Sequence, residues 1–462
     1  MLPYRSLTKY RWAIYLLLTP PAYCNTLLET VELGLQNNLS IRASLKGLEE
    51  SENNIGVSRS KFLPSLSATA NTNWSENNAI RSGEVDDASH SQTSGVGLSL
   101  SQTIFNLGDI YKYQTAKLNY DAEELSHENQ VQSVIVEIAT NYFEYLKNNA
   151  QIKATEVELK SSISRENQMR RNVELGNTAG SEMYEVTAQK EEVSNRLRSL
   201  RKDREVLLND LSLLIQYPVV PSQDLYSRAE LDAFDKTQTQ ALITDALKFN
   251  SDVLIARNTL EVTRQGLKES AANFVPTLQM TGGYNYDYTH DFEDTADPAA
   301  TGKSDSANIG LNLNIPILSG GSDYYDYQKS SKSIERQEIL YQDTLFSTRN
   351  EVNTVIMDIN DLSDSVESYE RIIRANYASY RGIQRAQQLG TRTITDLLAA
   401  ESKLFNAVRD YQNTRYDYAI NIINLEKSKG SLSIESIQNL MSLMVEMNPE
   451  TDEELIPMHL LD

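Results

Sequence analysis

The feature of this sequence that most constrains its fold is a repeat of about 210 residues. The segment Phe62–Leu66 (FLPSL) returns as Phe274–Leu278 (FVPTL), with the second proline 212 residues after the first. The segment Leu175–Thr178 (LGNT) returns in related form as Leu389–Arg392 (LGTR), with its glycine 214 residues further along. Two landmarks with nearly one offset predict a tandem duplication, and such a repeat sets the architecture before any local motif does.

The N-terminus has the pattern of a secretory signal peptide. Three basic residues flank the start of a short apolar run, Trp12–Leu18, which is too short to span a bilayer as a helix. Small residues stand three and one positions before Asn25, so we expect residues 1–24 to be removed. Two alternatives stay open: lipoprotein processing at Cys24, which Tyr23 before it disfavours, and a retained N-terminal helix.

Charge and cysteine content argue against several classes of protein. Removal of three basic residues with the signal peptide would take the net charge from −21 to −24. Such a surface disfavours nucleic acid as a partner, because phosphate binding needs basic groups. The only cysteine would leave with the signal, so the mature chain would have no disulfide or thiolate metal site. No nucleophile elbow, phosphate loop or zinc-protease motif points to an enzyme, and no cofactor is expected.

Each repeat contains two segments with the periodicity of a β-strand. Polar and apolar residues alternate over 65–74, 93–105, 277–289 and 307–318. Polar loops are expected between the strands of each pair, over 75–92 and 290–306. These strand lengths suit a membrane strand, which needs about 9–11 residues. The alternative is a soluble antiparallel sheet with one face on a core.

Four strands are too few to close a membrane barrel. Single-chain outer-membrane barrels have at least about eight strands, and an open edge would leave backbone groups unsatisfied in lipid. If these strands lie in a membrane, several copies must therefore share one barrel. Two copies would supply about eight strands and three about twelve, and the larger number can leave a lumen.

The remainder of each repeat is predicted to be helical. Residues 110–173 and 323–388 contain no proline, and turns follow near Gly176 and Gly390. After each turn an apolar residue recurs every seven positions: Val186, Val193, Leu200, Leu207 and Leu214, then Leu397, Leu404, Tyr411, Tyr418 and Leu425. This spacing favours left-handed coiled-coil packing. A helix of about 65 residues is about 100 Å long, which suits a structure that bridges a compartment.

The sequence thus divides into a signal peptide and four further segments. These are a first repeat over 25–220, a linker over 221–240, a second repeat over 241–432, and an acidic C-terminal segment over 433–462 that is expected to be partly disordered. The predicted fold class is mixed α and β, with long antiparallel helical hairpins and four strands in duplicated positions.

The segment Gly390–Leu398 (GTRTITDLL), followed by Arg415–Tyr418 (RYDY), resembles the TolC family of outer-membrane efflux and type I secretion channels. The helix-to-strand junctions at Pro64 and Pro276 and the segment 315–321 (IPILSGG) add to this resemblance. The family implies a homotrimer in outer-membrane lipid, whose shared twelve-stranded β-barrel continues into a periplasmic α-barrel. It also implies two partners, a periplasmic adaptor (membrane fusion protein) and an inner-membrane RND or ABC transporter.

The resemblance implies roles for the turns of the helical hairpins. Leu175, Gly176, Leu389 and Gly390 match the tips that contact the adaptor. Glycine suits such turns because it accepts a positive φ.

Four polar residues beyond the tips match the periplasmic gate of the family: Ser181, Glu182, Arg392 and Asp396. Threefold symmetry would turn Asp396 into a ring of carboxylates, which favours cations and can bind hydrated metal ions. An aspartate and a tyrosine common in the family are replaced here by Ala399 and Gln387. The gate is therefore expected to be weaker or differently linked. The alternative is ordinary solvated charges, worth about 0–1 kcal/mol as a pair.

The expected function is a passive exit duct in the outer membrane that extends into the periplasm. Small toxic molecules and unfolded proteins both remain open as cargo, and the sequence does not identify the pump or the adaptor. A periplasmic coiled-coil scaffold or a surface adhesin is an alternative of a different class. It would account for the heptads but not for the four alternating strands in duplicated positions.

Overall fold

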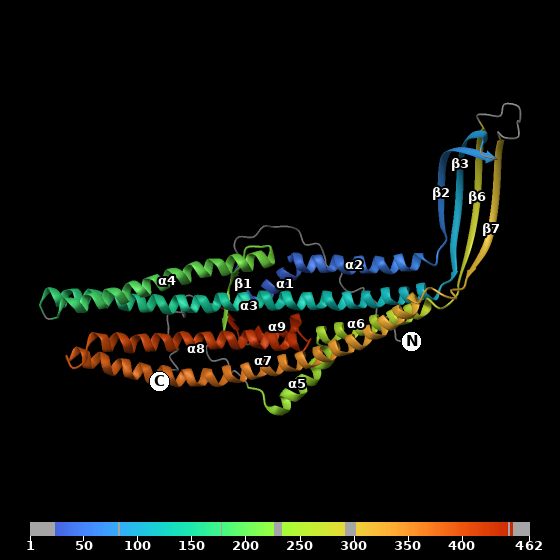
Figure 1. Ribbon diagram of the computed structural model, residues 1–462. Coiled ribbons are helices and arrows are strands. Elements are labelled where there is room, and N and C mark those ends of the chain that lie inside the picture. The colour runs from blue at the N-terminus through green and yellow to red at the C-terminus, as the bar shows by residue number, and fades with distance from the viewer. Residues whose placement is uncertain are drawn as a thin grey trace.

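The chain forms an elongated molecule, with a four-stranded sheet at one end of a helical body and two helix turns at the other (Figure 1). The computed structural model describes residues 24–81, 84–176, 178–225, 233–291, 302–441 and 444–446. The predicted signal peptide lies outside this part except for Cys24. Within the described ranges, none of the helices combines the length and the apolar character that a membrane span requires.

The two repeats contain the same elements in the same order. The first repeat consists of α1 (Leu27–Asn37), α2 (Leu39–Ser60), β2 (Ser65–Arg81), β3 (Glu84–Phe105), α3 (Leu107–Glu174) and α4 (Gly180–Ile215). The second consists of α5 (Lys236–Phe249), α6 (Ser251–Ala272), β6 (Thr277–Asp291), β7 (Gly302–Asn314), α7 (Ser322–Gln388) and α8 (Ile394–Ser428). This correspondence confirms the duplication. Pro64 and Pro276 lie directly before β2 and β6, where a rigid φ and a missing N–H end the helical path.

Short elements near the middle of the body precede, separate and follow the two repeats (Figure 1). They are β1 (Cys24–Asn25), β4 (Val220–Pro221), β5 (Gln223–Leu225), α9 (Ile434–Met441) and β8 (Met444–Glu446). β1 pairs with β4 in parallel, and β5 pairs with β8 in antiparallel. α5 begins at Lys236, inside the predicted linker, because Asp235 and Gln238 form a capping box. The predicted C-terminal segment begins with ordered structure, namely α9 and β8. Residues 447–462 lie outside the described part.

The prediction of a loop over 75–92 is wrong for most of its length, because β2 and β3 continue into it. Apolar residues no longer alternate there, but an antiparallel ladder is held by backbone groups and does not need them. The hydroxyls of Ser75 and Ser91, which are directly opposite each other, lie 2.8 Å apart. Side-chain periodicity alone therefore underestimates the length of the two strands in this hairpin.

The second strand hairpin also differs from its predicted bounds. β7 starts at Gly302, within the segment predicted to be a loop, and ends at Asn314 rather than at residue 318. Pro316 has no N–H to donate to a ladder, which explains the early end of the strand. The apolar pattern that continues to Ile317 was therefore misleading.

Cross-strand register gives the sheet one apolar and one polar face. The strand order is β2-β3-β6-β7, with every pair antiparallel. One row across the four strands is Ala68, Leu98, Tyr284 and Ala307, and the next row on the opposite face is Ser67, Ser99, Gly283 and Asn308. The apolar residues are solvent-exposed in the single chain, and Leu66 is 70% and Ile309 80% exposed. The predicted period-two pattern is thus confirmed in three dimensions.

The helical body is one layer with two free edges. α3 packs against α2, α4, α6 and α8, and α7 packs against α6 and α8. The heptad positions face these contacts: all five in α8 are buried, as are Val186 and Val193 in α4. α2 and α4 therefore form one edge of the layer, and α7 forms the other.

In each repeat, a buried asparagine between the two short helices links them to the end of the last long helix. The Oδ1 atom of Asn38 accepts hydrogen bonds from the first turn of α2, and its Nδ2 donates to the carbonyl of Leu214 at the end of α4. Asn250 does the same in the second repeat, where its Nδ2 donates to the carbonyl of Ser428 over 2.8 Å. Each side chain is a helix cap and also a tertiary contact.

We expect Asn250→Ala to lower the free energy of unfolding by about 2 kcal/mol, because it removes an N-cap and leaves the carbonyl of Ser428 unpaired. Chemical denaturation in detergent, followed by circular dichroism, measures the change. Asn53→Ala is a matched control, since its side chain is exposed and bonds only to Glu49 of its own helix. Equal effects of the two substitutions would contradict the assignment.

Candidate functional site

The two hairpin turns present exposed apolar tips at the end of the body opposite the sheet (Figure 1). Gly176 and Gly390 adopt φ values of 72° and 74°, in the left-handed region where a Cβ would add strain. Leu175 and Leu389 precede them and are 73% and 80% exposed. Each turn therefore exposes one large apolar side chain at this end of the molecule.

Arg392 and Asp396 lie close together at the start of α8. Their Nη1 and Oδ2 atoms are 3.9 Å apart, and both side chains are substantially exposed. Asp396 also forms a capping box with Thr393, whose backbone N–H donates to Oδ2 over 3.1 Å. The hydrogen bonds from Thr393, and then the charge of Arg392, hold the pKa of Asp396 below its ordinary value. The carboxylate therefore stays ionised at neutral pH.

Ser181 and Glu182 lie in the first turn of α4, on the other hairpin. In the single chain, as far as the structure describes it, neither side chain forms a hydrogen bond or ion pair with Arg392 or Asp396. A different pair joins the hairpins near the tips: the hydroxyl of Thr395 donates to Oε2 of Glu185 over 2.8 Å. The sequence pattern does not indicate this link, because Glu185 lies about one turn further along α4 than Ser181 and Glu182.

Above the tips, buried charges join α3 to two of the helices that pack against it, α4 and α8. Glu158 of α3 is 2% exposed and accepts hydrogen bonds from Arg196 of α4 over 3.1 Å and from Arg409 of α8 over 2.9 Å. One carboxylate thus connects the first hairpin to the second. In a low-dielectric site such hydrogen-bonded ion pairs hold their partners in one geometry.

Two further ionic contacts lie on α3 within the next two turns. Arg165 forms an ion pair with Glu401 of α8, and Ser161 donates to the same carboxylate over 2.6 Å. Glu166 accepts from Lys190 of α4 over 3.2 Å. Ionic contacts therefore hold α3 to α4 and to α8 between the tips and the middle of the body.

The sequence indicates part of this set of ionic contacts between α3, α4 and α8. Lys190 and Glu401 each stand four residues after a heptad residue, at a position that a coiled coil turns towards its partner. A charged residue there is costly unless it is paired, so the pattern predicts a buried ionic contact. The pattern does not identify the partner residues, because Arg165 and Glu166 lie on α3, and the heptad spacing in α4 and α8 does not determine how α3 aligns with them.

The described residues of the single chain contain no cluster of three metal-ligating side chains. A metal-binding ring at Asp396 would need three copies of the chain.

Comparisons with known proteins agree with this architecture. The sequence is 25% identical to outer membrane protein TolC of Escherichia coli over 445 residues, which cover 92% of this chain and 86% of that protein. It is 21% identical to the alkaline protease secretion protein AprF of Pseudomonas aeruginosa over 419 residues, which cover 90% and 86%. The fold is similar to that of the Campylobacter jejuni CmeC outer membrane channel, with a TM-score of 0.73, 20% identity, and coverage of 94% and 90%.

The family described as "Outer membrane efflux protein" matches residues 30–215 and 242–431, which together make up most of the chain and coincide with its two helix-and-strand repeats. The chain therefore belongs to the outer membrane efflux protein family and is an outer-membrane channel rather than an enzyme.

Proposed function

We propose that three copies of this chain form the passive exit duct of a tripartite export system. In this assembly the twelve strands close one barrel in the outer membrane, and the helices form a tunnel through the periplasm. The observation that carries the proposal is the four-stranded sheet with an exposed apolar face and two unpaired edges, β2 and β7. Such a sheet is stable in lipid only when its edges pair with other copies.

The free edges of the helical layer support the same assembly. α7 exposes Ile339, and the opposite edge exposes Val57 of α2 and Leu213 of α4. Each of these apolar side chains is more than half exposed in the single chain. Packing α7 of one copy against α2 and α4 of the next would bury both edges in a ring, which is a heterologous and closed interface.

The partners follow from the location of the tips. Leu175, Gly176, Leu389 and Gly390 form the exposed end where a periplasmic adaptor would bind, with an inner-membrane RND or ABC transporter beyond it. A relative named as a protease secretion protein and another named as a probable efflux pump outer membrane protein both resemble this chain. Proteins and small molecules are therefore both candidate cargo.

The gate would consist of the polar residues just above the tips. In the trimer, Arg392 could reach Ser181 and Glu182 of the adjacent copy, and three copies of Asp396 would form a ring of ionised carboxylates. The Thr395–Glu185 hydrogen bond would hold the two hairpins of each copy together. These contacts are exposed and individually weak, so an adaptor that binds the tips could break them.

We expect Arg392→Ser to raise the single-channel conductance in a planar lipid bilayer, on the order of twofold, because a charged link that narrows the entrance is lost. Thr395→Val should act in the same direction, because it cuts the link to Glu185. Purified protein reconstituted into the bilayer gives the conductance directly, and the wild-type channel tests the duct itself.

Arg385→Ser is a matched control for the conductance measurement. Arg385 is an exposed arginine in the last turn of α7, one turn before the tip. The substitution Arg385→Ser should leave the conductance unchanged. If Arg392→Ser and Arg385→Ser behaved alike, the gate assignment would be wrong, and a wild-type protein without conductance would overturn the duct.

A further inference from the structure

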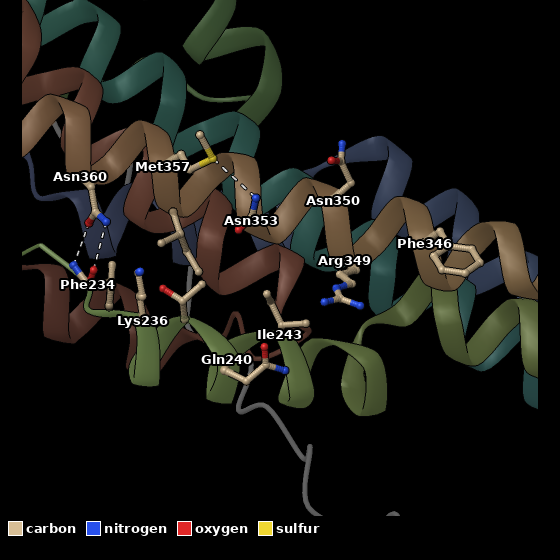
Figure 2. A pocket seen from close by; sticks show the side chains of 12 residues that line it. Phe234, Lys236, Gln240, Ile243, Phe346, Arg349, Asn350, Asn353, Met357 and Asn360 are labelled. Carbon is tan, nitrogen blue, oxygen red and sulfur yellow. Dashed lines mark hydrogen bonds between the residues drawn. The ribbon is translucent and has the colours of Figure 1, made fainter.

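A groove between α5 and α7 differs in charge from the rest of this acidic chain. It has a volume of about 550 Å³ and lies where α5 crosses the long helix. Its lining includes Lys236 and Arg349 and no carboxylate, although the chain as a whole carries a net charge of −21. Figure 2 shows Lys236 on α5 and Arg349 on α7 directed into the space between the two helices. A groove of this kind favours an acidic ligand.

The groove is also apolar enough to hold side chains. Ile243 and Ile356 form its buried floor, while Phe346 and Met357 of α7 are 69% and 62% exposed. One end is rigid, because the amide of Asn360 exchanges two hydrogen bonds with the backbone of Phe234. The groove therefore suits an extended peptide that alternates carboxylates with large apolar residues.

The C-terminus of this chain has that composition. Residues 447–462 include five carboxylate side chains, five large aliphatic or methionine side chains from residue 455 onward together with Met447, and neither lysine nor arginine. The terminal carboxylate adds a further negative charge. We propose that residues 447–462 bind in the α5–α7 groove of the same chain, with their carboxylates beside Lys236 and Arg349.

The chain geometry allows this contact. Glu446 pairs with Gln223 in the β5–β8 ladder, and Phe234 at the groove lies eleven residues beyond Gln223. Glu446 is therefore at most about 45 Å from the groove, whereas sixteen extended residues span up to about 55 Å. The two sites also share a core residue, since Ile422 packs against the cluster that holds Met444 and against the cluster that holds Phe234.

A photo-crosslinking amino acid at Phe346 of the full-length chain in native membranes tests the proposal. The expected product is a link to a peptide from residues 447–462 that runs as a single chain on a denaturing gel. The same probe at Ile339, an exposed α7 residue outside the groove, should give no link to this peptide. A probe at Phe346 that links to α2 or α4 of another copy, to another copy's C-terminus, to a different protein or to nothing would overturn it.

Charge reversal distinguishes binding from chance proximity. The double substitution Lys236→Glu and Arg349→Glu should lower the yield of the crosslink at least fivefold. Lys248→Glu is the matched control, because Lys248 is exposed on α5 and does not line the groove. An unchanged yield in the double variant would contradict the proposed role of the two cations. Conductance is a separate readout, so failure of this proposal and failure of the duct can be told apart.

Discussion

Replacement of Glu158 by alanine is expected to lower the free energy of unfolding by about 3–5 kcal/mol. Glu158 is buried between Arg196 and Arg409, so its loss leaves the largely buried guanidinium group of Arg409 and the partly exposed one of Arg196 without their carboxylate. The loss also removes one link between the two hairpins, since this side chain bonds to α4 and α8 at once. Chemical denaturation in detergent, followed by circular dichroism, measures the effect.

Glu156→Ala is the matched control on the same helix. Glu156 forms an ion pair with Arg201 over 2.7 Å, and both side chains are about half exposed. An exposed pair contributes about 0–1 kcal/mol, because water solvates each charge when the pair is broken. If the two variants lost the same stability, burial would not be what makes Glu158 important.

Replacement of Gly430 by alanine should have an effect of similar size, about 2–5 kcal/mol. Gly430 follows α8 with a φ of 72°, and a Cβ there would stand 2.1 Å from the carbonyl oxygen of Phe249. Strain and collision therefore act together, and the colliding atom belongs to the backbone and cannot rotate away. The same denaturation experiment measures this loss.

Gly266→Ala makes the same chemical change and should act in the opposite direction. Gly266 lies inside α6, and its added methyl group would have no neighbour within 4 Å. Alanine in a helix interior is favoured over glycine by about 0.5–1 kcal/mol. A loss of stability in both variants would mean that the contact at Phe249 is not the cause.

The counterpart of Gly430 in the first repeat illustrates what a repeat cannot predict. Gln216 follows α4 at an offset of 214 residues and also has a positive φ, of 57°. The local path of the chain is thus conserved between the repeats even though the residue is not. Only the approach of Phe249, which comes from another helix, makes glycine necessary at one of the two positions.

In the candidate site, too, the sequence predicted the local features but not the contacts between hairpins. The turn glycines were identified from their spacing, and the structure gives both a positive φ. Arg392 and Asp396 are close because Arg392 directly precedes Thr393, the N-cap of α8, and Asp396 lies in the first turn of that helix, so the contact is local in sequence. The Thr395–Glu185 contact joins two hairpins, and its residues have no fixed separation in sequence. No periodicity could have indicated it.

The sequence by itself determined the duplication, the type of nearly every long element, and the apolar stripe of each strand and helix. These properties are local, because they depend on which side of a strand or helix a residue occupies. The tertiary structure alone decided the lengths of the strand hairpins, the partners of the buried charges and the position of the groove beside α7. Each of these depends on the distance between segments far apart in the chain, and that distance is set by how the helices and strands pack against one another.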